Sequence, residues 1–258
     1  GFPHYFSIIN NKNETFKINV LEYINGSFLS SYYVYQNSAL QMFEDLERLK
    51  REPHGCFEQL SSTVYPNIFI LDYLKSTKKI DANTESTVIR NLKKGYSKMI
   101  SYKNQDGGFS YFGGSESDVA LSAFALLEFR DLKKYVNVDA KLIQNLTSFI
   151  LSKKGANGLF EVRKGYEFKS QYSEYSWSRN MYVLYALSKL GFKNELLQNY
   201  DYSLKRVLAT KDSYQLALMA NTAKNLDKTE DYSSLITILN QQYESKNVKT
   251  KTTFTGSG

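Results

Sequence analysis

The chain contains one cysteine, Cys56, and a glutamine, Gln59, stands three residues after it. At the start of a helix that spacing puts both side chains on one face, within reach of each other. A thiolate that attacks the Gln59 carboxamide would expel ammonia and join the two side chains as a thioester. Gly55 permits the close backbone approach that such a ring needs. The spacing therefore predicts an activated acyl group, open to attack by an amine, a hydroxyl or water.

A lone cysteine also has a simpler interpretation, because a buried Cys56 would pack as a small hydrophobe without chemical duty. One cysteine forms no disulfide within the chain, so the count neither requires nor excludes an oxidising compartment. His54 lies two residues before the cysteine, where it would act either as a base or as an ordinary loop residue. These residues alone leave both pairs of alternatives open.

The elements that must position these side chains are mostly helices. From Ser38 onward, apolar residues recur with helical period in about nine segments. Short loops such as Lys193-Asn194 imply antiparallel neighbours, which favours a bundle or a ring of helical hairpins. The apolar segments cover residues 40–49, 68–74, 88–99, 120–129, 142–151, 181–190, 196–208, 214–226 and 235–243.

Residues 1–36 have a different pattern. Phe16, Ile18 and Val20 alternate with polar residues, and Gly26 separates them from the aromatic-rich run 28–35. Alternation around a glycine turn indicates a pair of strands. Because such a pair is barely stable alone, it is expected to belong to a β-domain continued elsewhere.

Two loops, 104–110 and 156–160, each follow a predicted helix with glycine and then an aromatic residue. This order is typical of a chain that turns back over a helix end. A structural turn is favoured over a binding loop for both.

Composition excludes several classes of function. The chain of 258 residues is 42% hydrophobic, enough for a sizeable core, and it has neither a membrane-spanning apolar run nor a secretory signal pattern. The net charge of +7 comes from lysines scattered among acidic residues, often in pairs near helix ends, which argues against a nucleic-acid patch. One cysteine and two histidines cannot supply the usual zinc ligands, so no metal or cofactor is expected.

The chain contains Pro-His-Gly-Cys-Phe-Glu-Gln at 53–59, followed by the segments 61–63, 65–67, 105–110, 116–118, 123–125 and 214–221. In these matching segments, and in their order, the sequence resembles the thioester segment of bacterial alpha-2-macroglobulin-like proteins, which are relatives of the complement components. The resemblance implies an α/α toroid at 37–258, inserted in a split, CUB-like β-sandwich that contributes residues 1–36. It also implies that the chain is a fragment of a larger protein, with a ring that is incomplete at its C-terminal end.

Carried onto this sequence, the resemblance implies that Cys56 donates the sulfur and Gln59 the acyl carbon. Glu58 matches the motif without a role in bond making, and Phe57 either shields the bond or packs in the core. Some complement relatives carry a histidine that redirects the acyl group to hydroxyls, but residues 111–117 supply none here. The resemblance therefore implies direct attack by amines, such as lysines of a target protein.

Three functions follow as hypotheses. The first is an endopeptidase inhibitor, not an enzyme, which traps target proteases through their lysine amines and works with other domains of its parent chain. The second is a helical protein-binding module whose thioester never forms or has hydrolysed. The third, a terpenoid-cyclase-like toroid enzyme, lacks the acidic cluster or zinc set that such enzymes need. The resemblance places the protein in the cell envelope (periplasm or outer surface) or outside the cell, without direct membrane contact by this segment.

Overall fold

The computed structural model describes residues 53–78, 80–114, 116–161 and 174–245. Within these ranges the chain forms eight α-helices and one 3₁₀ turn, Asn194–Leu196. The helices are α3 (Phe57–Ser76), α4 (Ala82–Ile100), α5 (Val119–Leu132), α6 (Ala140–Ser152), α7 (Glu174–Lys189), α8 (Leu197–Thr210), α9 (Ser213–Asn225) and α10 (Thr229–Ser245).

Aspartate side chains mark where four of these helices begin. Asp81, Asp118, Asp139 and Asp212 are the N-cap residues of α4, α5, α6 and α9, and each accepts a hydrogen bond from a first-turn backbone N–H. A carboxylate at this position satisfies an otherwise unpaired donor and favours the positive end of the helix dipole. Helix α3 differs, because its N-cap residue is Cys56.

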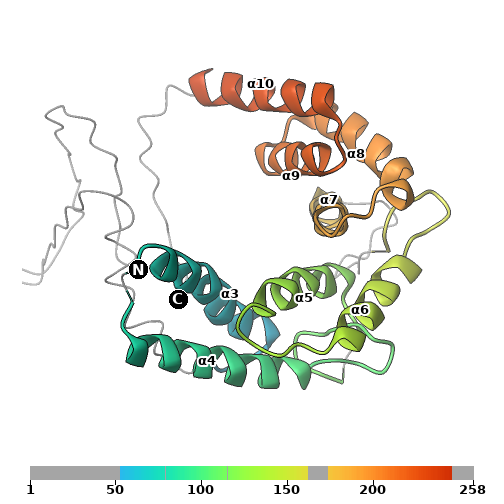
Figure 1. Ribbon diagram of the computed structural model, residues 1–258. Helices are drawn as coiled ribbons and strands as arrows, with labels where there is room; N and C mark the ends of the chain where they lie inside the picture. The colour runs from blue at the N-terminus through green and yellow to red at the C-terminus, as the bar shows by residue number, and fades with distance from the viewer. Residues whose placement is uncertain (1–52, 79, 115, 162–173, 246–258) are drawn as a thin grey trace, which may run out of the picture.

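The helices form hairpins arranged as an open ring (Figure 1). Helices α3, α5, α7 and α9 pack side by side along the inside, while α4, α6, α8 and α10 lie behind them on the outside. This arrangement confirms the predicted α/α toroid. All eight helical segments predicted from residue 68 onward are present. The predicted helix at 40–49 and the predicted strand pair at 16–35 lie outside the described residues.

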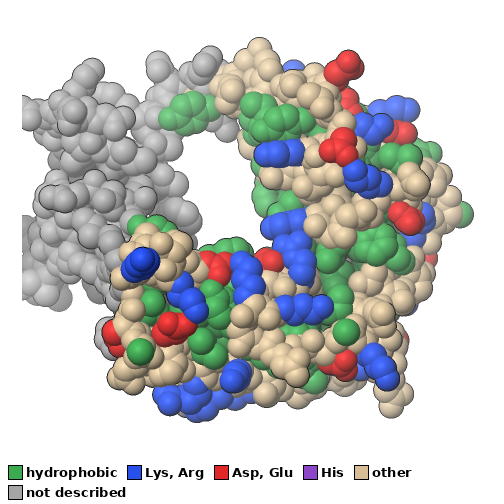
Figure 2. All heavy atoms as spheres, in the orientation of Figure 1, with side chains coloured by type: hydrophobic (Ala, Val, Ile, Leu, Met, Phe, Trp, Pro, Cys, Tyr) green, Lys and Arg blue, Asp and Glu red, His purple; other side chains and the backbone are tan. Residues whose placement is uncertain are grey.

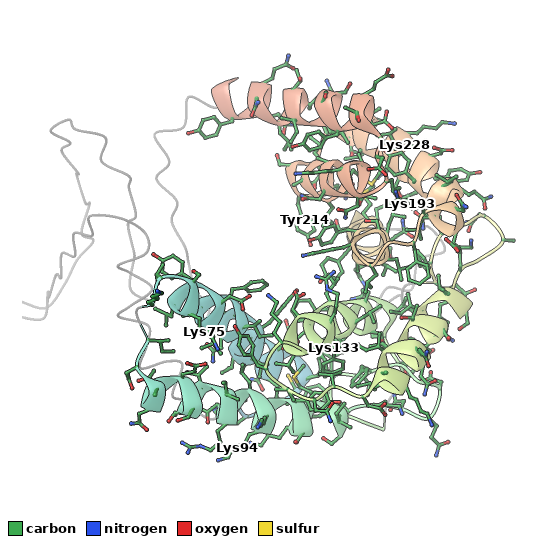
Figure 3. The ribbon with its side chains drawn as sticks, viewed as in Figure 1. Lys75, Lys94, Lys133, Lys193, Tyr214 and Lys228 are labelled. Atoms are coloured by element: carbon green, nitrogen blue, oxygen red, sulfur yellow. The ribbon has the colours of Figure 1, made fainter. Side chains whose placement is uncertain are left out.

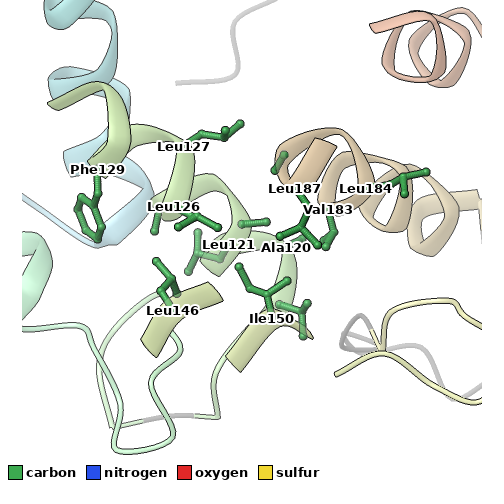
Figure 4. Packing of buried hydrophobic residues seen from close by; sticks show 14 of the residues in the cluster. Ala120, Leu121, Leu126, Leu127, Phe129, Leu146, Ile150, Val183, Leu184 and Leu187 are labelled. Atoms are coloured by element: carbon green, nitrogen blue, oxygen red, sulfur yellow. The ribbon is translucent and has the colours of Figure 1, made fainter. Parts of the chain in front are cut away.

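Helix α5 is the centre of the core. It is enclosed by α3, α6 and α7, so apolar residues occur around most of its circumference, where a surface helix would carry a single stripe. Figure 4 shows its leucines packed against α6 and α7. The side chains in this contact include Leu121, Leu126, Leu146, Ile150, Val183 and Leu187, all of them buried.

The two glycine-containing loops are structural turns, as predicted, and they share one design. In each loop a lysine pairs with a phenylalanine six residues later in an isolated antiparallel bridge, Lys103 with Phe109 and Lys154 with Phe160. Both phenylalanines are buried. Each also donates its backbone N–H to a polar side chain of an inner helix, Phe109 to Ser122 at 2.9 Å and Phe160 to the Asn180 amide oxygen at 3.0 Å. The loops therefore fasten the outer helices to the inner ones.

Charged side chains are dispersed over the molecule. Figure 2 shows Lys and Arg interspersed with Asp and Glu on the face that it displays, and Figure 3 shows Lys94, Lys133 and Lys193 distributed over different helices and turns. Lys133 and Lys153 are the C-cap residues of α5 and α6, which agrees with the predicted placement of lysines at helix ends. None of the described helices is both long and apolar enough to cross a membrane.

An acidic side chain, that of Glu128, is enclosed between inner helices of the ring. Glu128 on α5 is fully buried, and burial raises the pKa of its carboxyl group to about 8, with the Ser61 hydroxyl on α3 offsetting part of the rise. Tyr65 on α3 and Tyr182 on α7 face the same region. Burial above all raises the pKa of both tyrosine hydroxyls, and the Glu128 charge adds to each rise. Glu128 is thus a protonated acid at neutral pH.

The raised pKa predicts how Glu128 affects stability. The pKa of this carboxyl group is about 8 in the folded protein and ordinarily 4.5. The contribution of Glu128 to the free energy of unfolding is therefore fully present below pH 4.5 and declines as the pH rises towards 8. The decline is at most about 1.4 kcal/mol per pH unit. Glu128→Gln abolishes this cost, so urea denaturation should show the variant gaining stability over wild type between pH 5 and pH 8. The exposed control Glu230→Gln should show no such gain, and an equal Glu128→Gln difference at both pH values would contradict the account.

Candidate functional site

The predicted thioester residues meet at the N-terminal end of α3. Cys56 is the N-cap residue, in extended conformation (φ −69°, ψ 173°), and Gln59 is the third helical residue. The backbone N–H of Cys56 donates a hydrogen bond to Gln59 Oε1 at 2.9 Å. In return the Cys56 side chain faces the backbone N–H of Gln59, which completes a capping box. The helix start therefore brings the thiol and the carboxamide together within one turn.

Gly55 makes this contact possible. Its φ of +94° lies in the left-handed region, and a Cβ at this position would stand 2.0 Å from Gln59 Oε1. Any other residue would strain the backbone and push the Gln59 carboxamide away from Cys56. The close approach that was predicted for Gly55 is thus present in the structure, between its backbone and the Gln59 side chain.

Phe57 forms the floor of the site. Its side chain is fully buried, and its ring lies 5.2 Å from the ring of Phe109 and 6.3 Å from that of Tyr102, centroid to centroid. The Phe57 backbone N–H, left free by the helix, donates to the Tyr111 carbonyl oxygen at 3.0 Å. Phe57 is therefore a core residue that anchors the first turn of α3 to the loop around Phe109 and Tyr111.

Helix α4 holds the chain that leads into α3, because its C-terminal end lies beside the N-terminal end of α3 (Figure 1). Lys98 Nζ donates to the carbonyl oxygen of Pro53 at 2.7 Å. The Tyr102 hydroxyl donates to the carbonyl oxygen of Gly55 at 2.8 Å. Two carbonyl groups of the segment before Cys56 are thus held by hydrogen bonds from side chains of α4 and the loop that follows it.

The two remaining candidates, His54 and Glu58, are exposed on either side of Cys56. Glu58 lies in the first turn of α3, where a carboxylate interacts favourably with the helix dipole. Among the described residues, no hydrogen bond links His54 to Cys56. The structure thus brings Cys56 and Gln59 together and leaves His54 and Glu58 facing solvent.

No motif in the sequence marks Lys98, Tyr102 and Tyr111 as residues of the site. The available signal is their position, because Tyr102 and Tyr111 flank the loop 104–110, which belongs to the matching segments. Their contacts to the motif run partly through backbone atoms, which a side-chain pattern does not encode.

The geometry suits acyl chemistry. Attack on the Gln59 carboxamide carbon builds negative charge on Oε1, the atom that the Cys56 N–H already contacts. A preorganised donor at that atom lowers the barrier, because it stabilises the charge without moving. Cys56 is half-buried and Gln59 exposed, so the pair lies at the surface, within reach of an incoming nucleophile.

The fold and the site together define the class of protein. It is an α/α toroid in which the inner helix α3 begins with a Cys-Gln pair, and the glycine before the cysteine permits the contact between them. The chain belongs to the A-macroglobulin TED domain family, whose model matches residues 23–251.

Individual relatives agree with this family. The chain is 29% identical over 161 residues to thioester-containing protein 1, allele S3, of Anopheles gambiae, with 61% of this chain and 12% of that protein covered. It is 25% identical over 208 residues to alpha-2-macroglobulin-like protein 1 of Mus musculus, with 77% and 14% covered. The chain therefore spans about one eighth of the length of these relatives.

A solved structure shares the fold. The structure of Salmonella alpha-2-macroglobulin reacted with methylamine superposes with a TM-score of 0.59 at 16% sequence identity. The match covers 77% of this chain and 13% of the Salmonella chain.

A matched pair of glycine variants tests the geometry at Cys56. Gly55 and Gly191 have nearly equal φ values, +94° and +93°, but a Cβ would meet Gln59 at the first and nothing within 4 Å at the second. Both changes to alanine strain the backbone, but only Gly55→Ala should also break the bond from Cys56 N–H to Gln59. We expect an extra cost of about 1 kcal/mol in the free energy of unfolding and faster hydrogen exchange of the Cys56 amide. Equal costs with unchanged exchange would refute the contact.

Proposed function

We propose that the chain is the reactive domain of an alpha-2-macroglobulin-like protease trap, in which an internal thioester between Cys56 and Gln59 captures targets by acylating their amines. The observation that carries the proposal is the reciprocal contact of these two residues at the start of α3. Membership of the A-macroglobulin TED domain family supports it.

The bond would form without a cofactor. The Cys56 thiolate attacks the Gln59 carboxamide carbon, the carbon–nitrogen bond breaks, and the nitrogen leaves as ammonia after taking up a proton. A target lysine amine then attacks the same carbon, the carbon–sulfur bond breaks, and Cys56 leaves as a thiolate. The product is an amide between Gln59 and the target. Each thioester reacts once, so the proposed activity is that of an endopeptidase inhibitor and not of an enzyme.

Amines are the proposed nucleophiles. Some complement relatives carry a histidine that redirects the acyl group to hydroxyls, and the resemblance places the corresponding position in residues 111–117. The chain has two histidines, and neither lies in that segment. The Salmonella relative in the structural comparison was reacted with methylamine, a small primary amine, which is consistent with the same preference. His54 beside Cys56 stays a candidate base, and His4 lies outside the described residues.

The remaining parts of a trap would lie elsewhere in the protein. The matched relatives are about eight times longer than the aligned region, which leaves room for a bait segment and for the domains that enclose a protease. The proposed partners are target proteases and these neighbouring domains. The proposed location is the cell envelope (periplasm or outer surface) or the outside of the cell, supported by the likeness to a Salmonella protein.

A second candidate function is a protein-binding module without a reactive thioester. It is favoured by aromatic residues on the inner helices, where Tyr65 packs on Phe69 at 5.0 Å and on Phe124 at 5.5 Å between ring centroids. Phe69 is 47% exposed, and Tyr214, also exposed, lies on the inner side of the ring (Figure 3). The exposure of Gln59 points the same way, since water would reach a thioester at that position.

Amine uptake separates the two functions. We expect freshly purified protein to incorporate one methylamine and to release one titratable thiol in parallel. Cys56→Ala and Gln59→Glu should each abolish the uptake, because one removes the sulfur and the other removes the amide that thioester formation consumes. Mass spectrometry and thiol titration measure the two events.

The matched control is Gln105→Glu, the same chemical change at an exposed loop position. This variant should incorporate methylamine as wild type does. If wild-type protein shows a free thiol from the start and takes up no amine, the trap proposal is wrong and the binding module remains.

A further inference from the structure

One peptide unit connects Tyr102 to the Gln59 carboxamide. The carbonyl oxygen of Gly55 and the N–H of Cys56 belong to the same planar group. The Tyr102 hydroxyl donates to that oxygen at 2.8 Å, and the N–H donates to Gln59 Oε1 at 2.9 Å. The three groups therefore form a chain of two hydrogen bonds that ends on the atom where charge develops during acyl transfer.

We infer that Tyr102 is a positioning residue for the thioester chemistry, which orients and polarises the Gly55–Cys56 peptide so that its N–H stabilises the oxyanion on Gln59. The inference rests on the proposed function and adds a residue to it. Tyr102 touches neither reacting atom and acts through the peptide.

Polarisation gives the first part of the effect. A donor on the carbonyl oxygen draws electron density towards that oxygen and makes the N–H of the same peptide a stronger donor. The strengthened N–H matters most when Oε1 carries negative charge, which happens when the thiolate attacks and again when an amine attacks the thioester. Both steps pass through an oxyanion on the same oxygen, so Tyr102 should accelerate both.

Orientation gives the second part. Gly55 has a φ of +94°, and glycine has more conformational freedom than any other residue, so the peptide after it needs an external support. The Tyr102 hydroxyl is such a support, because it fixes the carbonyl oxygen and thereby aims the N–H on the opposite side of the planar group. Without it, the N–H would spend part of its time pointing away from Oε1.

Tyr102 is itself rigidly held. Its ring meets the buried Phe57 ring edge to face, at 6.3 Å between centroids and 89° between planes. Its backbone N–H donates to Met99 at 3.1 Å, and its carbonyl oxygen accepts from Ser110 at 3.2 Å. A side chain whose packing and backbone are both fixed can place a hydroxyl without further ordering. The same phenylalanine thus supports the helix that carries Gln59 and the tyrosine that acts on it.

The first test is Tyr102→Phe, which removes the hydroxyl and keeps the ring against Phe57. We expect methylamine-triggered thiol release to slow about three- to tenfold, the effect of one hydrogen bond. The matched control is Tyr135→Phe, which removes a hydroxyl bonded to Asp72 towards the other end of α3 and should leave the rate unchanged.

A spectroscopic readout separates this role from general support of the fold. With carbon-13 in the glutamine side-chain carbonyl, infrared difference spectra isolate the thioester C=O stretch of Gln59. Weaker hydrogen bonding in Tyr102→Phe should raise its frequency, and the Tyr135→Phe spectrum should match wild type. A monofluorinated tyrosine at position 102, whose hydroxyl is a stronger donor, should shift the rate and the frequency in the opposite direction.

The outcomes distinguish this inference from the proposed function. If wild-type protein takes up methylamine while Tyr102→Phe reacts at the same rate with an unshifted carbonyl band, the role of Tyr102 is refuted and the thioester stands. If wild-type protein shows neither ammonia loss nor amine uptake, the proposed function fails and this inference fails with it.

Discussion

The site depends on one hydrogen bond, from the backbone N–H of Cys56 to Oε1 of Gln59. Four other helices of the ring, α4, α5, α6 and α9, begin with an aspartate whose side chain accepts a hydrogen bond from the helix itself. Helix α3 has in addition a contact in the opposite direction. The side chain of Gln59, inside the first turn, reaches back and accepts a hydrogen bond from the backbone N–H of the N-cap residue Cys56. A capping box, a common motif at the start of a helix, thereby holds the Gln59 carboxamide beside the Cys56 thiol.

The ring supplies the rigidity that this contact needs. Phe57 anchors the first turn of α3 in the core, and the outer helix α4, with the loop that follows it, holds the approach through Lys98 and Tyr102. Helix α5 ties α3 to the rest of the ring by packing against both α3 and α7. Phe57, Lys98 and Tyr102 thus support the Cys56–Gln59 pair from the core and from α4 and its loop, while Gln59 itself is exposed to solvent.

Local patterns predicted much of this structure, and long-range contacts did not follow from them. Helical periodicity located every described helix, and the spacing of Cys56 and Gln59 located the pair, because both signals act within one or two turns. Tyr102 lies 47 residues from Gly55, and its partner is a backbone oxygen, so no pattern of side chains marks the contact. The burial of Glu128 likewise results from the packing of α3 and α7 against α5, and an acidic residue in a sequence does not by itself indicate that it is buried.

The central claim is that Cys56 and Gln59 are covalently joined in the native protein, and the intact mass tests it most directly. Freshly purified protein, kept free of amines and denatured in acid immediately before the measurement, should be lighter by one ammonia than its sequence requires. The deficit should map to the peptide that contains residues 53–59, and Cys56 should not titrate as a thiol. A full sequence mass with a freely titrating Cys56 would contradict the account.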